Sequence, residues 1–358
     1  PSRPVTAGLD RPDAAIPNNF PPALDIIGWN YKPHRYREFH EKYPHIPQFG
    51  SETASTISSR GEYFFPVETG PEWHHHENIQ CSSYDLEFPP WASTPDREFD
   101  MQDACPWIFG EFVWTGFDYL GEPTPYNAHW PAHASYFGIF DLVGLPKDRA
   151  WLYAARWSGQ PVLHLLPHWT WPGREGQNTP VHVYTNYDSV ELFVNGISAG
   201  IRARSGSKYR LIWNDVSYTP GELTAVARDA SGKELARETV RTASAPAKLA
   251  LSADRTTLSA DGEDLGFITV SVQDQEGNLQ PHAGHTIRFE VSGAGSFAAA
   301  GNGNSASTED FYSGNIDAFH GQCVCIVRAG KADGTIRLTA SADGLAPATI
   351  ELTVAGKA

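Results

Sequence analysis

The feature that most constrains the fold is a change of period near residue 160. Before it, strand-length apolar runs alternate with helix-length segments, whereas short alternating runs bounded by Gly, Asn, Asp and Pro follow it. The first pattern is typical of a parallel sheet with crossover helices, and the second of antiparallel sandwiches. We therefore expect a multidomain chain, α/β and then all-β, and 358 residues allow two or three folding units.

The α/β part, residues 1–158, contains three strand-helix units. The stretch before residue 24 is rich in Pro and is predicted to be loop. The later predicted elements are strand 24–31, helix 34–44, strand 45–52, a helix starting at Ser93 or Thr94 with Pro95 in its first turn, strand 106–120 and helix 147–157.

Two sets of short alternating runs follow, and each predicts an immunoglobulin-like β-sandwich, over 159–245 and 246–358. The small, polar link "TASAPAK" (242–248) separates them. Cys323 and Cys325 are expected as buried thiols on one face of a strand. The sequence leaves open whether Cys81 and Cys105 pair, because pairing requires an oxidising compartment.

The net charge of −15 disfavours nucleic acid and anionic membranes as partners, because the electrostatic contribution to binding would be repulsive. No apolar run is long enough to span a bilayer. A neutral ligand fits better. The 11 Trp and 14 Tyr residues can stack on sugar rings, although aromatic side chains also build ordinary cores.

Polar and aromatic side chains follow three predicted parallel strands: Asn30 with Tyr31, Glu52, and Trp114. In an α/β barrel, catalytic side chains project from such strand ends. A carboxylate, a phenol and an indole suit the cleavage of a sugar acetal, in which the carboxylate attacks the anomeric carbon, the phenol positions it and the indole packs on the sugar. The alternative is that Tyr31 and Trp114 only pack in the barrel or its loops.

Long segments of the chain resemble glycoside hydrolase family 2. "IPQFGSETASTISSRGEY" (46–63) resembles its nucleophile segment, "DIIGWNYKPHRY" (25–36) the preceding strand, and "WIFGEFVWTGFDYLGEPTPY" (107–126) its last barrel strand. Segments 137–157, 163–173 and 183–200 resemble the bacterial β-galactosidase branch. The resemblance implies the C-terminal part of a (β/α)8 TIM barrel, its last three strand-helix units, followed by two immunoglobulin-like domains.

The resemblance further implies a retaining exo-β-glycosidase, most closely a β-galactosidase, that hydrolyses terminal β-galactosides through a covalent glycosyl-enzyme on Glu52. Tyr31 is then the phenol that hydrogen-bonds the nucleophile, and Trp114 is a wall of the sugar subsite. Asn30, Glu111 and Asp118 lie in matching motifs as substrate-binding candidates, with a buried network as the alternative for the last two. No cofactor is implied. We expect a bacterial protein of the periplasm or the cell exterior.

The chain departs from the family in two ways. Retaining hydrolysis needs a second carboxylate, which the family carries in an Asn-Glu pair, and this sequence contains no such pair. Glu111 is a poor replacement, because its odd separation from Trp114 points it to the opposite face of a regular strand. With three of the eight barrel strands, the chain is expected to be a C-terminal half that needs the N-terminal part, as a second chain or missing segment, for activity.

The loop "EWHHHENIQ" (72–80) contains three adjacent His residues, a residue type that binds zinc. Adjacent His residues rarely converge on one tetrahedral metal site, however. We therefore expect no metal. The loop is either solvated or covers the barrel mouth, where His75 or Trp73 contacts the sugar.

Two other functions stay open. One is an inactive fragment that binds carbohydrate or braces an assembly, and the other is a related specificity, such as β-glucuronidase or β-mannosidase. The family's β-glucuronidases carry an Asn-x-Lys motif after the last strand, which is absent here; "NYK" (30–32) precedes the nucleophile, so a neutral sugar is favoured.

Overall fold

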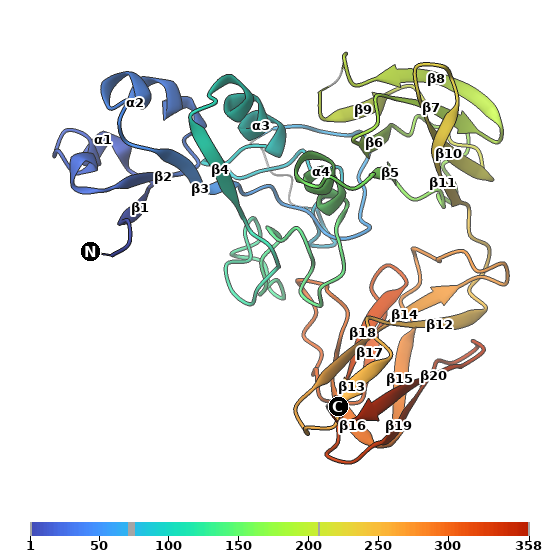
Figure 1. The fold of residues 1–358 in the computed structure, drawn as a ribbon. Helices are drawn as coiled ribbons and strands as arrows, with labels where there is room; N and C mark the ends of the chain where they lie inside the picture. Colours follow the sequence, from blue (N-terminus) through green and yellow to red (C-terminus); the bar gives the residue numbers. More distant parts are fainter. Residues whose placement is uncertain (1, 71–75, 207, 357–358) are drawn as a thin grey trace.

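The α/β part is built on a parallel sheet of four strands, in the order β1-β2-β3-β4 (Figure 1). The computed structural model describes residues 2–70, 76–206 and 208–356. The strands are β1 (Thr6–Leu9), β2 (Ile26–Asn30), β3 (Gln48–Ala54) and β4 (Ile108–Trp114). The expected count of three strands is wrong, because β1 lies within the predicted loop. Its four residues carry little periodic signal and form a strand by pairing with β2.

The helices of this part are short. They are α1 (Pro12–Ala15), α2 (Tyr36–Lys42), α3 (Pro95–Ala104) and α4 (Asp148–Trp157), with 3₁₀ turns η1 (Pro21–Ala23) and η2 (Pro33–Arg35). The predicted helix 34–44 is thus divided between η2 and α2. Helix α3 begins as predicted, with Thr94 at the N-cap position and Pro95 first in the helix.

One face of the sheet packs on these helices. Ile27 and Trp29 of β2 form a buried core with Tyr36 and Phe39 on the α2 side. Trp29 also donates its indole N–H to Gln48 Oε1 of β3 at 2.9 Å. Gln48 therefore points to the helices, and alternation along the strand turns its neighbour Phe49 to the opposite face.

That opposite face carries aromatic side chains with little cover. Phe109 and Phe112 of β4 are 60% and 67% exposed. Both contact Phe49, with ring centroids 5.2 and 5.7 Å apart. Parallel sheets ordinarily have both faces covered. An exposed apolar surface on the outer strand β4 is therefore unusual for a parallel sheet.

After α4 the chain is all β. The first sandwich consists of two antiparallel sheets, ordered β11-β10-β7-β8 and β5-β6-β9. Its strands are β5 (Leu163–Leu166), β6 (Val181–Thr185), β7 (Ser189–Val194), β8 (Ile197–Ala203), β9 (Arg210–Trp213), β10 (Glu222–Arg228) and β11 (Glu234–Arg241). One hydrophobic core joins it to the α/β part, because Phe99 of α3 and Leu152 and Tyr153 of α4 pack with Tyr184 and Leu211.

The second sandwich follows the link 242–247. Its sheets are ordered β12-β14-β18-β16 and β13-β20-β19-β15-β17. Its strands are β12 (Lys248–Ala253), β13 (Thr257–Ser259), β14 (Leu265–Gln273), β15 (Thr286–Gly293), β16 (Gly295–Gly301), β17 (Asn315–Asp317), β18 (Gln322–Ala329), β19 (Gly334–Ser341) and β20 (Ala348–Ala355). Cys323 and Cys325 of β18 are buried free thiols, as predicted, and Cys81 and Cys105 are also free and buried.

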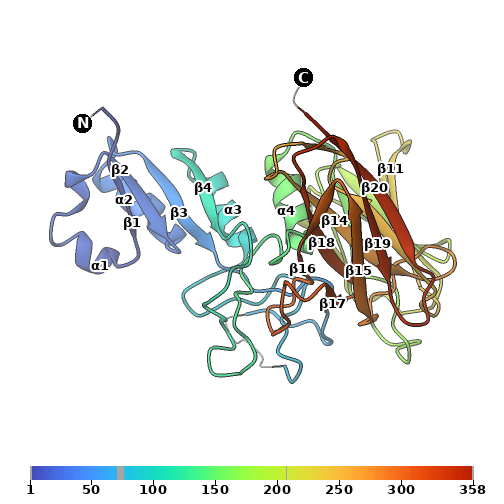
Figure 2. The same ribbon diagram turned by 90° about the horizontal axis from the view of Figure 1, so that it is seen from below.

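Arg60, in the long connection after β3, ties the α/β part to the second sandwich. Its Nε lies 2.7 Å from Asp141 Oδ2, and Nη2 donates to the carbonyls of Asn302 and Phe319 at 2.9 and 3.1 Å. Figure 2 shows long loops of the α/β part running between the parallel sheet and the second sandwich. The connection that follows Glu52 is therefore anchored to the C-terminal part of the chain.

Among the helices of the described residues, none combines the length and the apolar character needed to cross a bilayer.

Candidate active site

Tyr31 and Glu52 meet at the carboxyl ends of β2 and β3. The hydroxyl of Tyr31 donates to Glu52 Oε2 at 2.7 Å, and its backbone N–H donates to the carbonyl of Glu52 at 2.9 Å. Tyr31 has a φ of 59°, in the left-handed region that a bulky residue rarely adopts. Such strained residues cluster at functional sites, and here the conformation accompanies a double contact with the carboxylate residue.

The phenol of Tyr31 acts as a hydrogen-bond donor. Burial raises its pKa well above the usual value, and the neighbouring Glu52 carboxylate raises that pKa further. The group therefore stays protonated at neutral pH. Among the described residues, Tyr31 is the hydrogen-bond donor to the Glu52 side chain, and Glu52 Oε1 accepts no hydrogen bond from them.

These residues line an open cleft of about 1060 Å³, which we call the active-site cleft. Its lining residues are Asp10, Arg11, Pro12, Asp13, Ala14, Tyr31, Lys32, Glu52, Trp91, Trp114 and Glu122. The expected trio of Tyr31, Glu52 and Trp114 thus shares one cavity. The lining has four carboxylates against two cationic side chains, which disfavours an anionic ligand.

Trp114 is held in place by the loop that follows it. Its indole N–H donates to the hydroxyl of Tyr119 at 3.2 Å, and that hydroxyl donates to Glu122 Oε2 at 2.5 Å. The Trp114 and Tyr119 rings are nearly perpendicular, at 87°. Sequence reasoning missed Glu122 and Trp91. The only available signal for Glu122 was its position in segment 107–126, because tertiary folding alone returns this loop to the cleft.

Asn30 lies beside the cleft and is not part of its lining. Its Oδ1 accepts a hydrogen bond from Ser51 Oγ at 2.7 Å. Two glycines leave room for this pair: a Cβ on Gly8 would lie 2.5 Å from Asn30 Oδ1, and one on Gly28 would lie 2.5 Å from Ser51 Oγ. The pair links β2 to β3 immediately before Tyr31 and Glu52.

Glu111 lies outside the cleft lining, in a largely buried network. Thr53 Oγ1 donates to Glu111 Oε2 at 2.5 Å. Burial raises the pKa of Glu111 to about 7, with a further contribution from Glu98. Glu98 itself accepts a hydrogen bond from Tyr36 Oη at 2.5 Å. This position favours the network alternative over sugar binding for Glu111.

Asp118 is also internal. It forms a buried ion pair with Lys147, with Nζ and Oδ2 2.6 Å apart, and accepts a hydrogen bond from the Gly138 N–H at 2.7 Å. Lys147 in turn donates to the carbonyl of Ser58 at 2.6 Å. Through Lys147, Asp118 therefore helps to hold the connection after Glu52 in place. This geometry favours a buried network over sugar binding as the role of Asp118.

His75 and Trp73 lie outside the described residues. Their described neighbour His76 stacks on Phe64, with ring centroids 3.4 Å apart. Within residues 2–70, 76–206 and 208–356, no group of three His, Cys, Asp or Glu side chains converges closely enough to hold a metal ion.

Family models match the β-sandwich parts of the chain. One, described as glycoside hydrolase family 2 C-terminal domain 5, matches residues 249–351. Another, described as a domain of unknown function (DUF4982), matches residues 176–236.

Curated relatives extend over the α/β part as well. The β-galactosidase BoGH2A of Bacteroides ovatus is 39% identical and aligns with 98% of this chain and 42% of its own length. A putative β-glucuronidase of Formosa agariphila is 30% identical over 71% of this chain and 25% of its own length. The chain thus spans less than half of these relatives.

Solved structures of glycosidases also match nearly the whole chain. A β-glycosidase from Bacteroides vulgatus superposes with a TM-score of 0.83 at 28% identity, covering 98% of this chain and 51% of that one. A family 2 glycosyl hydrolase from Bacteroides cellulosilyticus gives a TM-score of 0.79 at 29% identity, covering 98% and 45%.

Proposed function

Because this chain belongs to glycoside hydrolase family 2 and corresponds to the C-terminal half of its relatives, we propose that it supplies the nucleophile half of a retaining exo-β-glycosidase. The observation that carries the proposal is the hydrogen bond from Tyr31 to Glu52 inside a cleft that Trp114 also lines. The parallel sheet is, in this proposal, part of a (β/α)8 barrel.

Glu52 is the nucleophile in the proposed reaction. Its Oε1 attacks the anomeric carbon, the bond to the leaving oxygen breaks, and water later releases the sugar from the covalent glycosyl-enzyme. Tyr31 keeps its proton and holds the other carboxylate oxygen, so the attacking oxygen is oriented before the sugar binds. Trp114, fixed by Tyr119, offers an apolar ring for the sugar to pack on.

The general acid is proposed to come from outside this chain. A retaining enzyme needs a second carboxylate about 5–5.5 Å from the nucleophile. Glu111 is unsuited to that role, because it lies outside the cleft lining and is engaged by Thr53. We propose that the N-terminal half of the enzyme carries the acid and covers the aromatic face of Phe109 and Phe112.

The proposed substrate is a terminal β-galactoside. The excess of carboxylates in the cleft favours a neutral sugar over a glucuronide. Lys32, one of the two cationic residues of the cleft, forms an ion pair with Asp10, with Nζ and Oδ1 3.6 Å apart. This pairing partly neutralises the charge of Lys32. The name of the 39%-identical relative points to the same sugar class.

Covalent labelling tests the proposal. The chain is combined with the N-terminal half of its parent enzyme and treated with a 2-deoxy-2-fluoro-β-galactoside carrying an activated leaving group. We expect the label on Glu52 in peptide mass spectrometry and loss of turnover in Glu52→Gln. Glu41→Gln, an exposed carboxylate change on α2, is the matched control and should keep activity. A label on another carboxylate would refute the assignment, and full activity of this chain alone would refute the division of the site.

A further inference from the structure

A second cavity, of about 630 Å³, lies between the connection after β3 and the first sandwich. We call it the sandwich pocket. It is lined by Phe65, Pro66, Val67, Thr69, Leu86, Arg174, Gln177, Asn178, Pro180, His182, Ile212, Asn214 and Asp215. None of these residues lines the active-site cleft. Seven of them fall within 176–236, the region that matches a domain of unknown function.

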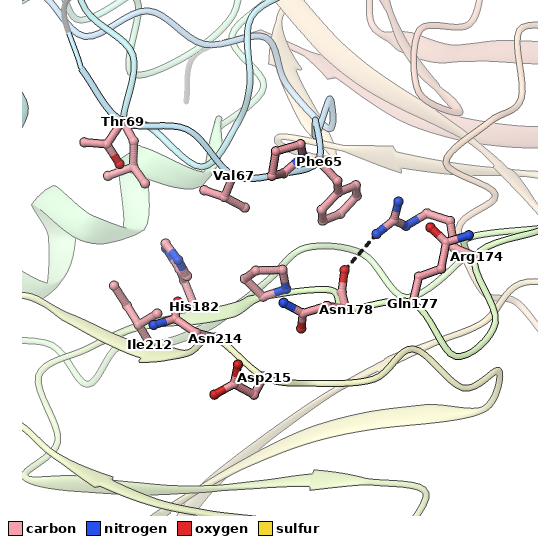
Figure 3. Close-up of a pocket in the computed structure, with 13 residues that line it drawn as sticks. Phe65, Val67, Thr69, Arg174, Gln177, Asn178, His182, Ile212, Asn214 and Asp215 are labelled. Carbon is pink, nitrogen blue, oxygen red and sulfur yellow. Dashed lines mark hydrogen bonds between the residues drawn. The ribbon is translucent and has the colours of Figure 1, made fainter.

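The pocket has apolar walls on two sides. Figure 3 shows Phe65 and Val67 on the loop above it and Ile212 on the strand below. Phe65 is fixed by an edge contact with Trp171, at 5.2 Å between centroids, and by the Arg174 guanidinium 3.9 Å from its ring centroid. These walls are therefore preformed, which lowers the entropic cost of binding.

Polar side chains at the rim have unused hydrogen-bonding capacity. Within the described parts of the chain, the side chains of Asn178, Asn214 and Asp215 have no hydrogen-bond partner in the protein. Arg174 donates through Nη2 to the carbonyl of Asn178 at 2.8 Å, but its Nε has no partner (Figure 3). Amide, carboxylate and guanidinium groups thus converge on one cavity with donors and acceptors free.

His182 adds a buried polar group to the lining. It is 2% exposed, and its Nδ1 has no hydrogen-bond partner among the described residues. Burial, followed by the charge of Arg210, lowers the pKa of His182 to about 3, so the ring is neutral. His182 lines the pocket, so its Nδ1 is a buried polar atom that a ligand bound there can satisfy.

We propose that the sandwich pocket binds a neutral oligosaccharide. Sugar hydroxyls both donate and accept, which suits paired amide and carboxylate side chains, while sugar C–H faces suit the apolar walls. The pocket carries one cationic residue, Arg174, and one anionic residue, Asp215, so it has no charge excess to select an ion. The site would hold a sugar chain away from the cleft. It extends the proposed function, because binding here requires neither Glu52 nor the second half of the enzyme.

Protein NMR tests this proposal on the chain itself. With isoleucine methyl groups labelled, the Ile212 methyl reports on the sandwich pocket, and the described residues that line the cleft include no isoleucine. The probes are lactose and β-1,4-galactotetraose. We expect saturable shifts of the Ile212 signal, with a Kd on the order of 1 mM.

Variants localise the binding. Asn214→Ala and Asp215→Ala change exposed side chains and should weaken binding at least about tenfold, as loss of hydrogen bonds to the sugar predicts. Trp114→Ala in the cleft and Asn315→Ala in the second sandwich should leave the Ile212 response unchanged. No Ile212 response to either sugar, or a response insensitive to both pocket variants, overturns the proposal. A stronger response to inorganic phosphate than to the sugars would also overturn it.

Discussion

Replacing Glu111 with Gln should stabilise the protein at neutral pH. Burial, with a further contribution from Glu98, raises the pKa of Glu111 to about 7 from an ordinary 4.5. The folded state therefore binds this proton more tightly than the unfolded state does. The contribution of the protonated group to stability is complete below about pH 4.5 and is lost as the pH rises through about 7.

The size of the effect follows from the same values. At about 1.36 kcal/mol for each pKa unit, the loss approaches roughly 3 kcal/mol above pH 7. Glutamine resembles the protonated acid, and its carbonyl can still accept the hydrogen bond from Thr53 Oγ1. We expect Glu111→Gln and the wild type to be equally stable near pH 4.5. The variant should become more stable as the pH rises, by up to about 3 kcal/mol at pH 8.

Urea unfolding followed by tryptophan fluorescence at several pH values measures this difference. Asp85 and Glu87 also have raised pKa values, of about 6 and 7, but they titrate in both proteins and largely cancel in the comparison. Glu41→Gln, an exposed change on α2, serves as the control and should show no such pH dependence. If Glu111→Gln were less stable than the wild type at pH 8, Glu111 would be ionised and specifically paired, and the network interpretation would fail.

Three further changes test other parts of the structure. Tyr31→Phe removes the hydrogen bond to Glu52 and should lower kcat of the two-part enzyme about 10- to 100-fold on a chromogenic β-galactoside. A decrease in kcat of less than about threefold would contradict the positioning role of Tyr31. Phe112→Ser, at an exposed position, should weaken association with the N-terminal half in sedimentation experiments. The free energy of unfolding should change by less than about 0.5 kcal/mol. Unchanged association would contradict the proposal that the N-terminal half covers this aromatic face. Arg60→Ala leaves the buried Asp141 carboxylate without its ion-pair partner, so the free energy of unfolding measured by thermal denaturation should fall by about 3–5 kcal/mol. A decrease below about 1 kcal/mol would mean that water takes the place of the Arg60 side chain.

Local sequence patterns were enough to predict the order of the structural units and the grouping of Tyr31, Glu52 and Trp114. Periodicity is a local property, so the change near residue 160 could be read directly. The grouping followed from geometry, because neighbouring parallel strands end at the same edge of a sheet. The start of α3 at Thr94 and Pro95 was predictable for the same local reason.

Strand β1, the roles of Glu111 and Asp118, and the make-up of the two cavities became clear only from the folded chain. Strand β1 is too short to show a period and exists through its pairing with β2. The sequence left Glu111 and Asp118 between two roles, because only packing shows that Thr53 engages the first and Lys147 the second. Glu122 enters the cleft through a loop, and the sandwich pocket brings residues 65–69 against strands more than a hundred residues later. Such contacts between distant segments depend on how whole layers pack, which a local pattern of side chains does not specify.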